Sequence, residues 1–158
     1  MSAFPEPGEQ NLYLVAHIKL LRQSLLHYIG RDLIEPTLQG VEASRAIYFA
    51  PFVVLSHDTA TDPVFNYGNK AALELFGMTW QELTTLPSRQ SAEMPNREER
   101  SRLLKTVSSQ GFIENYQGVR ISKQGKRFRI SQATVWNLRD NRGGYCGQAA
   151  AFSHWHYL

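Results

Sequence analysis

The sequence predicts one domain of the α+β class, in which helices pack on a mainly antiparallel sheet. Its 158 residues match the usual size of a single domain. Near the N-terminus, apolar residues recur at alternating steps of four and three, which indicates an amphipathic helix. Near the C-terminus, three apolar-rich segments are joined by glycine-bearing turns, which indicates an antiparallel meander.

The first expected element is a helix within residues 8–34. Its apolar stripe consists of Leu14, Ile18, Leu21, Leu25 and Tyr28. The stripe is too short for an independent coiled coil, so we expect it to dock on the sheet of its own domain or on a second protomer. Gly30 and Pro36 loosen the helix, and a connector follows. We therefore predict an N-terminal helical extension over residues 1–40 and a domain over residues 41–158.

Two strands and a short helix are expected next. Residues 46–55 are rich in β-branched and aromatic side chains and end at a polar run, so they are predicted to form the first strand. Residues 63–68 form a second, short extended segment. Asn69 can then cap a helix over residues 70–76, which Gly77 ends.

Two further helices are expected from their capping residues. Thr79 can cap a short turn over residues 80–83, because its hydroxyl oxygen can accept a free backbone N–H. Asn96 followed three residues later by Glu99 resembles a capping box. The apolar residues that follow it predict a helix over residues 97–110.

The C-terminal third is predicted to be a meander of three long strands. These strands cover residues 112–122, 127–138 and 145–157. Glycine lies in both connecting turns, over residues 123–126 and 139–144, as tight hairpin connections require. The complete order is therefore two strands, short helices, one longer helix and three strands.

This element order is that of a PAS domain, and two local motifs are similar to those of the family. Residues 65–77 (FNYGNKAALELFG) resemble the PAS run N-x-A-A-L-x-L-F-G, which packs on the sheet. Residues 118–128 (GVRISKQGKRF) resemble the PAS hairpin R-x-x-K-D-G-x-x-F. The resemblance implies a five-stranded antiparallel sheet that cups a small pocket under short helices on one face, with the N-terminal amphipathic helix added.

A narrower resemblance covers most of the chain. Residues 86–93 (LPSRQSAE), 118–122 (GVRIS), 135–138 (VWNL) and 147–150 (GQAA) resemble the MEKHLA domain. That PAS-like module forms the C-terminal part of plant class III homeodomain-leucine-zipper transcription factors and also occurs as small free-standing microbial proteins. The resemblance implies the free-standing form, and it implies a sensory or regulatory role without naming a ligand.

The composition and charge indicate the cellular compartment and the kinds of partner to expect. The single cysteine, Cys146, excludes an intramolecular disulfide and a thiolate-rich zinc site, which fits a reducing cytoplasm. The N-terminus lacks the pattern of a secretory signal, and no apolar run is long enough to span a bilayer. The formal charge of +3 is weak evidence for nucleic-acid or membrane binding. We therefore expect a cytoplasmic protein with no nucleic-acid and no membrane partner.

Strand alternation predicts which side chains face the pocket. In the strand over residues 127–138, the smaller and more polar set is expected to face the helices. That set consists of Arg129, Ser131, Ala133, Val135 and Asn137. The other set, which contains Phe128, Ile130 and Trp136, would form an apolar patch on the outer face that needs a cover. The predicted interface, within the chain or to a second protomer, comprises Leu14, Ile18, Leu21, Leu25, Phe128, Ile130 and Trp136.

Arg120 is the most informative residue of the predicted pocket. A guanidinium that points into the cup must be paired, so it needs Glu93, Asp58, Glu82 or an anionic ligand. A structural ion pair, or a register slip that exposes Arg120, remains the simpler alternative. The full predicted ligand-binding set is Tyr67, Arg89, Tyr116, Arg120, Ser131, Ala133, Gln148 and Phe152.

The known PAS cofactors fit the sequence poorly. The segment over residues 83–94, where a photosensory branch of PAS domains carries its flavin-reactive cysteine, has none. Where that branch places two asparagines and a glutamine against the ring, the chain has Arg120, Ser131 and Phe152. The predicted long helix contains no histidine for a haem iron. We leave the cofactor open and predict no metal site.

The sequence thus favours a non-catalytic PAS-like sensory module that binds a small ligand or a protein partner and forms a homodimer. It contains no nucleophile elbow, zinc-binding helix or dinucleotide fingerprint, so no catalytic residue is predicted. One alternative is a small enzyme that uses Arg120 with Ser131 or Tyr116 on an anionic substrate. Another is a purely structural dimerisation module.

Overall fold

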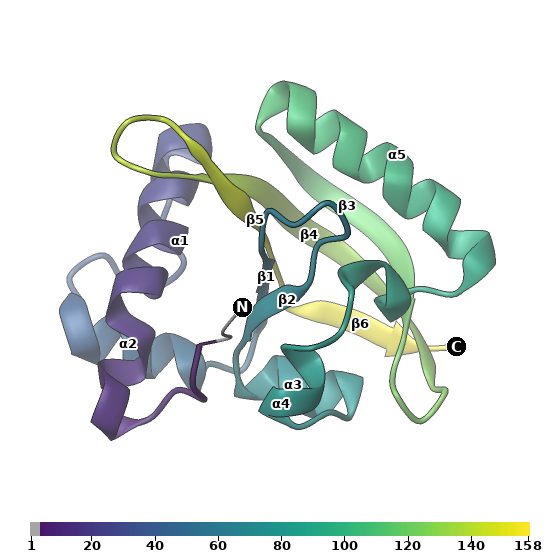
Figure 1. The fold of residues 1–158 in the computed structure, drawn as a ribbon, viewed down its shortest axis with the longest axis horizontal. Coiled ribbons are helices and arrows are strands. Elements are labelled where there is room, and N and C mark those ends of the chain that lie inside the picture. The colour runs from purple at the N-terminus through teal and green to yellow at the C-terminus, as the bar shows by residue number, and fades with distance from the viewer. Residues whose placement is uncertain (1–3) are drawn as a thin grey trace.

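The computed structural model describes residues 4–158, and for residues 94–96 it describes the backbone alone. The sheet runs in the order β2-β1-β5-β4-β3 with antiparallel pairs, and β6 continues β5 along β4 (Figure 1). The strands are β1 (Val53–His57), β2 (Phe65–Gly68), β3 (Phe112–Ile121), β4 (Arg127–Arg139), β5 (Tyr145–Phe152) and β6 (His154–Tyr157). The helices are η1 (Glu9–Leu14), α1 (Val15–Ile29), α2 (Gly40–Tyr48), α3 (Lys70–Phe76), α4 (Trp80–Leu83), η2 (Ser88–Ser91) and α5 (Met94–Gln110).

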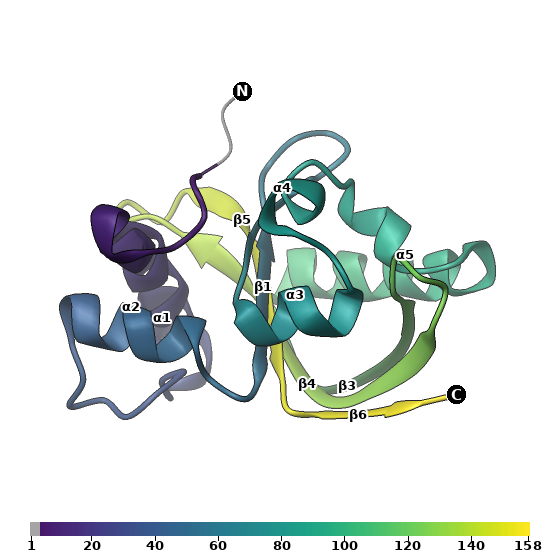
Figure 2. The same ribbon diagram turned by 90° about the horizontal axis from the view of Figure 1, so that it is seen from below.

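Helices cover both faces of the sheet. Figure 2 shows α1 and α2 on one side of β1, and α3, α4 and α5 on the other. We call the face toward α3 and α5 the inner face and the face toward α1 the outer face. Each face has its own core of buried apolar side chains. The predicted fold class, an α+β antiparallel sheet with short helices and an N-terminal helix, is confirmed. No helix within residues 4–158 is both long enough and apolar enough to cross a membrane.

The N-terminal helix docks on the outer face of its own sheet. Helix α1 covers the middle of the predicted range and follows the short 3₁₀ helix η1. Gly30 ends it in the left-handed conformation, with φ of 81°. The buried indole N–H of Trp136 donates to the carbonyl of Leu21 at 3.1 Å. Apolar side chains of α1 pack around the same indole. The chain therefore covers this part of its outer face itself.

The first predicted strand is wrong over residues 46–52. Helix α2 ends at Tyr48, and β1 begins only at Val53. Ala43 and Ile47 are both fully buried and lie four residues apart, on one face of the helix. A short apolar run does not distinguish a buried strand from the buried face of a helix. The packing of residues 40–48 against α1 and η1 favours the helix over the strand here.

The short helices follow their predicted caps. The Asn69 side chain accepts the Ala72 N–H at the start of α3, at 3.1 Å. At the start of α4, Thr79 and Glu82 form a reciprocal capping box.

The long helix starts earlier than predicted. Helix α5 begins at Met94 with Glu93 as its N-cap, so Asn96 lies inside the helix, and its side chain is outside the described part of the structure. Glu99 does not complete a capping box. Its carboxylate accepts the hydroxyl of Tyr116 at 2.9 Å instead. The Glu99 side chain, which the local pattern predicted to cap the helix, therefore makes a tertiary contact with Tyr116 instead.

A bulge in β4 reverses the predicted faces of its first half. Gln132 has φ of 53°, and the pairing of β4 with β3 shifts beside it. The extra residue restarts the alternation. As a result, Phe128 and Ile130 join the inner core, whereas Trp136 joins the outer core as predicted. The predicted placement of Phe128 and Ile130 on the outer face is therefore wrong.

Candidate functional site

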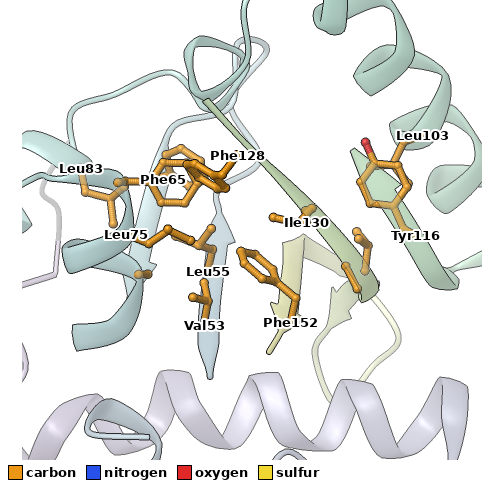
Figure 3. Packing of buried hydrophobic residues seen from close by; sticks show 14 of the residues in the cluster. Val53, Leu55, Phe65, Leu75, Leu83, Leu103, Tyr116, Phe128, Ile130 and Phe152 are labelled. Atoms are coloured by element: carbon orange, nitrogen blue, oxygen red, sulfur yellow. The ribbon is translucent and has the colours of Figure 1, made fainter. Parts of the chain in front are cut away.

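A small cavity lies between the inner face of the sheet and the segment formed by η2 and α5. Its volume is about 80 Å³. We call it the cup, and its lining comprises Leu55, Ser56, His57, Phe65, Phe76, Ser88, Ser91, Arg100, Leu103, Leu104, Tyr116, Arg120, Ile130, Ala133, Val135, Gln148, Ala149, Ala150 and Phe152. Figure 3 shows part of its apolar side, with Ile130 and Phe152 between the group around Phe65 and the pair Leu103 and Tyr116. The cup therefore joins a polar wall to an apolar one.

Five of the eight side chains predicted for the pocket line the cup. They are Tyr116, Arg120, Ala133, Gln148 and Phe152. On β3 the alternation holds over this stretch, so Tyr116 and Arg120 point to the same side. Which of these side chains bind a ligand stays a prediction.

The other three predicted side chains lie elsewhere. Tyr67 is buried in the outer core, with its ring centroid 5.8 Å from that of His17. Arg89 is exposed and pairs with Asp62 at 3.0 Å. Ser131 precedes the bulge at Gln132 and does not reach the cup, because the alternation there runs opposite to the prediction. Tyr67 therefore lies on the other face of the sheet, Arg89 lies in solvent, and Ser131 lies before a bulge that reverses the alternation.

Sequence reasoning missed a second arginine in the cup. Arg100 lies among the charged residues of α5, but it is only 8% exposed. It lies three and four residues before Leu103 and Leu104, on the side of α5 that faces the sheet. That spacing is the signal that could have placed it. One of its terminal nitrogens donates to the Ser88 hydroxyl of η2.

Arg120 is held by β3 itself. Its guanidinium donates to the carbonyl of Val119 at 2.9 Å and to the hydroxyl of Tyr116 at 3.2 Å. The same hydroxyl donates onward to Glu99. Burial raises the pKa of Tyr116, so this phenol stays protonated near neutral pH. Arg120 is therefore linked to the Glu99 carboxylate through a neutral hydroxyl group.

None of the three carboxylates considered as partners for Arg120 pairs with it. Glu93 binds Arg127, and Glu82 binds Lys123. Asp58 accepts two backbone N–H groups of its own loop, at 3.1 and 3.0 Å. Across the described residues, neither Arg100 nor Arg120 has a carboxylate at salt-bridge distance.

The two buried guanidinium groups raise the electrostatic potential of the cup. Burial and the nearby charge of Arg120 lower the pKa of Arg100 to about 10. Arg100 remains charged at neutral pH, but at a cost in free energy. Burial also lowers the pKa of His57, and the charge of Arg100 adds to this effect, so His57 is neutral.

Two buried acceptor atoms in the cup have no partner. His57 Nδ1 lies 2.9 Å from the carbonyl oxygen of Asp58, and that oxygen can only accept, so the proton sits on Nδ1. The Gln148 amide N–H donates to Asn137, whose own amide N–H donates to the carbonyl of Val107. When His57 is neutral, His57 Nε2 and Gln148 Oε1 are therefore both acceptors, and both are buried without a hydrogen bond. The Gln148 amide lies near this imidazole, because it raises the pKa of His57 against the larger effect of burial.

The family model of the MEKHLA domain matches residues 15–157, which is nearly the whole chain. The chain belongs to the MEKHLA domain family. The match begins at α1, so the helix that covers the outer face is part of the MEKHLA domain as the family model describes it. Comparison with curated proteins gives no match.

Solved structures with the same fold are PAS and light-oxygen-voltage domains. A PAS domain from Colwellia psychrerythraea superposes with a TM-score of 0.61 at 14% identity, over 73% of this chain and 93% of the other. A light-oxygen-voltage domain studied with a flavin analogue gives 0.59 at 15% identity, over 73% and 84%. An RNA-binding light-oxygen-voltage receptor gives 0.62 at 19% identity, over 77% of this chain but only 34% of that receptor. These likenesses establish the PAS fold of the MEKHLA chain.

The cup of the MEKHLA chain does not fit a flavin. Its volume of about 80 Å³ is near half of the roughly 150 Å³ that holds one benzene in an engineered cavity. Cys146 lies on β5 outside the cup, with its Sγ 3.4 Å from the Gly144 carbonyl oxygen. Two cationic side chains occupy the polar wall. The cup therefore admits a ligand of only a few non-hydrogen atoms.

Proposed function

We propose that this MEKHLA domain is a non-catalytic sensory module whose cup binds a small molecule. The observation that carries the proposal is the pair of partnerless acceptors, His57 Nε2 and Gln148 Oε1, in the wall of a cavity. A buried polar atom without a hydrogen bond costs about 1–3 kcal/mol. A ligand that supplies hydrogen-bond donors to these two atoms would recover that free energy.

The arrangement of the cup favours binding over catalysis. The enzyme alternative relies on Arg120 with Ser131 or Tyr116. Ser131 is not in the cup lining, and the Tyr116 hydroxyl is engaged by both Glu99 and Arg120. The raised pKa of Tyr116 makes it a poor base at neutral pH. The side chains of the cup are thus better suited to binding a charged, hydrogen-bonding ligand than to transferring protons.

Helix α5 and η2 are the elements through which binding would be signalled. Both contribute polar side chains to the cup, and Arg100 connects them through Ser88. A ligand that draws on Arg100 therefore acts on both elements at once. In contrast, a partner protein on the outer face near Trp136 would first have to displace α1, which disfavours that alternative. A homodimer through another surface remains part of the proposal.

Native mass spectrometry of the full chain, with a denatured control, tests ligand binding. Ala150 faces the cup and Ala151, its neighbour on β5, faces the outer core, so the two form a matched pair. We expect a non-covalent mass on the wild type and on Ala151→Leu, and none on Ala150→Leu, because the larger side chain fills the cup.

Two results would contradict the proposal. The first is the same bound mass on Ala150→Leu as on the wild type. The second is a wild-type chain that carries no bound mass and gains none from a metabolite extract.

A further inference from the structure

We propose that the ligand of the cup is a short organic monocarboxylate that carries a hydroxyl group, with its carboxylate on Arg100 and Arg120 and its hydroxyl on His57 or Gln148. This inference rests on the proposed function and adds the chemical class of the ligand.

The charge balance of the cup favours a monoanion. Arg100 and Arg120 are each 8% exposed and bring two positive charges to one small cavity. The Glu99 carboxylate, behind the Tyr116 hydroxyl, offsets one of them. The charge of Asp62 also acts on Arg100, but Asp62 already pairs with Arg89 at 3.0 Å. A net positive charge therefore remains in the cup, and a carboxylate group matches the planar guanidinium fork better than a point anion does.

The unpartnered acceptors favour a ligand that also carries a hydrogen-bond donor. Two backbone carbonyls, of Asp58 and Val107, fix the orientation of the donor network, so His57 Nε2 and Gln148 Oε1 can only accept. A simple carboxylate has no proton to give them. An ammonium group would supply protons, but it would add positive charge beside His57, whose pKa the charge of Arg100 already helps to lower. A neutral hydroxyl supplies a proton without that cost.

The size and the apolar wall limit the rest of the ligand. A cavity of about 80 Å³ has room for a few non-hydrogen atoms. The apolar wall of the cup includes Leu103, Leu104, Ile130, Val135 and Phe152. One or two carbon atoms between the carboxylate and this wall would bury apolar surface at little cost.

Three probes of nearly equal size separate the two recognition elements. Lactate carries both a carboxylate and a hydroxyl, propionate lacks the hydroxyl, and 1,2-propanediol lacks the charge. Each probe, with lactate as both enantiomers, is titrated into the isotope-labelled full chain at constant ionic strength. The shifts of the amide signals are followed by NMR. The expected order is lactate first, propionate about threefold to tenfold weaker, and 1,2-propanediol at least tenfold weaker than propionate.

Substitutions on one helix provide the matched control. Arg100→Met removes a buried, uncompensated charge, so we expect a folded protein with a thermal midpoint at or above that of the wild type. Its affinity for lactate should fall about tenfold or more. Arg102→Met removes an exposed charge from the same helix and should change neither property. Arg120→Gln gives a second, independent variant at the anion site.

The outcomes distinguish this inference from the proposed function. Tighter binding of lactate in the cup, lost in Arg100→Met and retained in Arg102→Met, supports the inference. Equal binding of 1,2-propanediol and lactate, or lactate binding that neither Arg100→Met nor Arg120→Gln changes, overturns it. If no probe binds while native mass spectrometry still detects a ligand that Ala150→Leu excludes, the chemical class is wrong and the proposed function stands. If both experiments are negative, both fail.

Discussion

His17 is a buried histidine that joins α1 to the sheet. Its Nε2 lies 2.9 Å from the hydroxyl oxygen of Ser56 on β1. The Ser56 hydroxyl donates to Asn66, so His17 must be the donor to Ser56. Burial lowers the pKa of His17 from 6.5 to about 4. His17 is therefore neutral in the folded state at pH 7, with its proton on Nε2.

Replacement of this histidine should flatten the dependence of stability on pH. The unfolded chain takes up a proton near pH 6.5 and the folded chain only near pH 4, so stability falls as the pH drops between these values. For His17 alone, the loss between roughly pH 7.5 and pH 5 is about 2 kcal/mol. We expect His17→Gln, which can still donate to Ser56, to remove most of that loss in urea unfolding measured at both values.

The lowered pKa of His57 acts in the same direction, so a smaller slope should persist in the variant. A slope in His17→Gln as steep as in the wild type would show that His17 does not carry the effect.

At the scale of the element, the bulge in β4 decides what the strand presents to each face. Its first half turns Phe128 and Ile130 inward, and after Gln132 the strand turns Ala133 and Val135 inward. Without the extra residue, the two halves could not both contribute to the inner core. The φ of 53° at Gln132 is a conformation that side chains other than glycine adopt at a cost.

Glycine at this position should stabilise the protein. We expect Gln132→Gly to raise the free energy of unfolding by about 1 kcal/mol, because glycine adopts a positive φ without strain. Ser131→Gly, at the neighbouring position with ordinary strand geometry, should lower it by about 0.5–1 kcal/mol. Chemical denaturation of both variants measures the difference. Destabilisation of equal size at both positions would rule out strain at Gln132.

For the whole molecule, the contact of α1 with the outer face completes the second core. Leu21 is fully buried there, and Trp136 and Leu138 of β4 are fully buried against the same helix. Two backbone groups of Arg139 also bond the hydroxyl of Ser24 in α1, at 3.0 and 3.4 Å. Helix and sheet should therefore unfold as one cooperative unit.

A single truncation in α1 tests this cooperation. Leu21→Ala should lower the free energy of unfolding by about 2–5 kcal/mol, because it opens a cavity against Trp136. Leu26→Ala, on the exposed side of the same helix at 46% exposure, should change it by less than about 0.5 kcal/mol. Tryptophan fluorescence and far-ultraviolet circular dichroism should report one coincident transition in both variants. Two separate transitions would mean that α1 is an independent appendage.

Much of the architecture follows from local patterns in the sequence. The caps at Asn69 and Thr79 are side chains bonded to their own helices, and the meander follows from turn residues between alternating segments. The family and the inward orientation of Tyr116 and Arg120 also follow from short motifs and from alternation along one strand. Interactions between residues close in sequence are enough to fix such features.

The contents of the cup depend on the tertiary structure. A bulge removed Ser131 from the cup, the packing of α5 buried Arg100 beside Arg120, and backbone carbonyls left His57 and Gln148 as free acceptors. The burial of Arg100 and the orientation of Gln148 depend on groups far apart in the sequence, whose positions cannot be read from local patterns. The sequence by itself determined a PAS-type sheet with an inward-facing arginine. Only the three-dimensional packing gave that arginine a second guanidinium and no carboxylate partner, because burial and pairing depend on which distant groups come together.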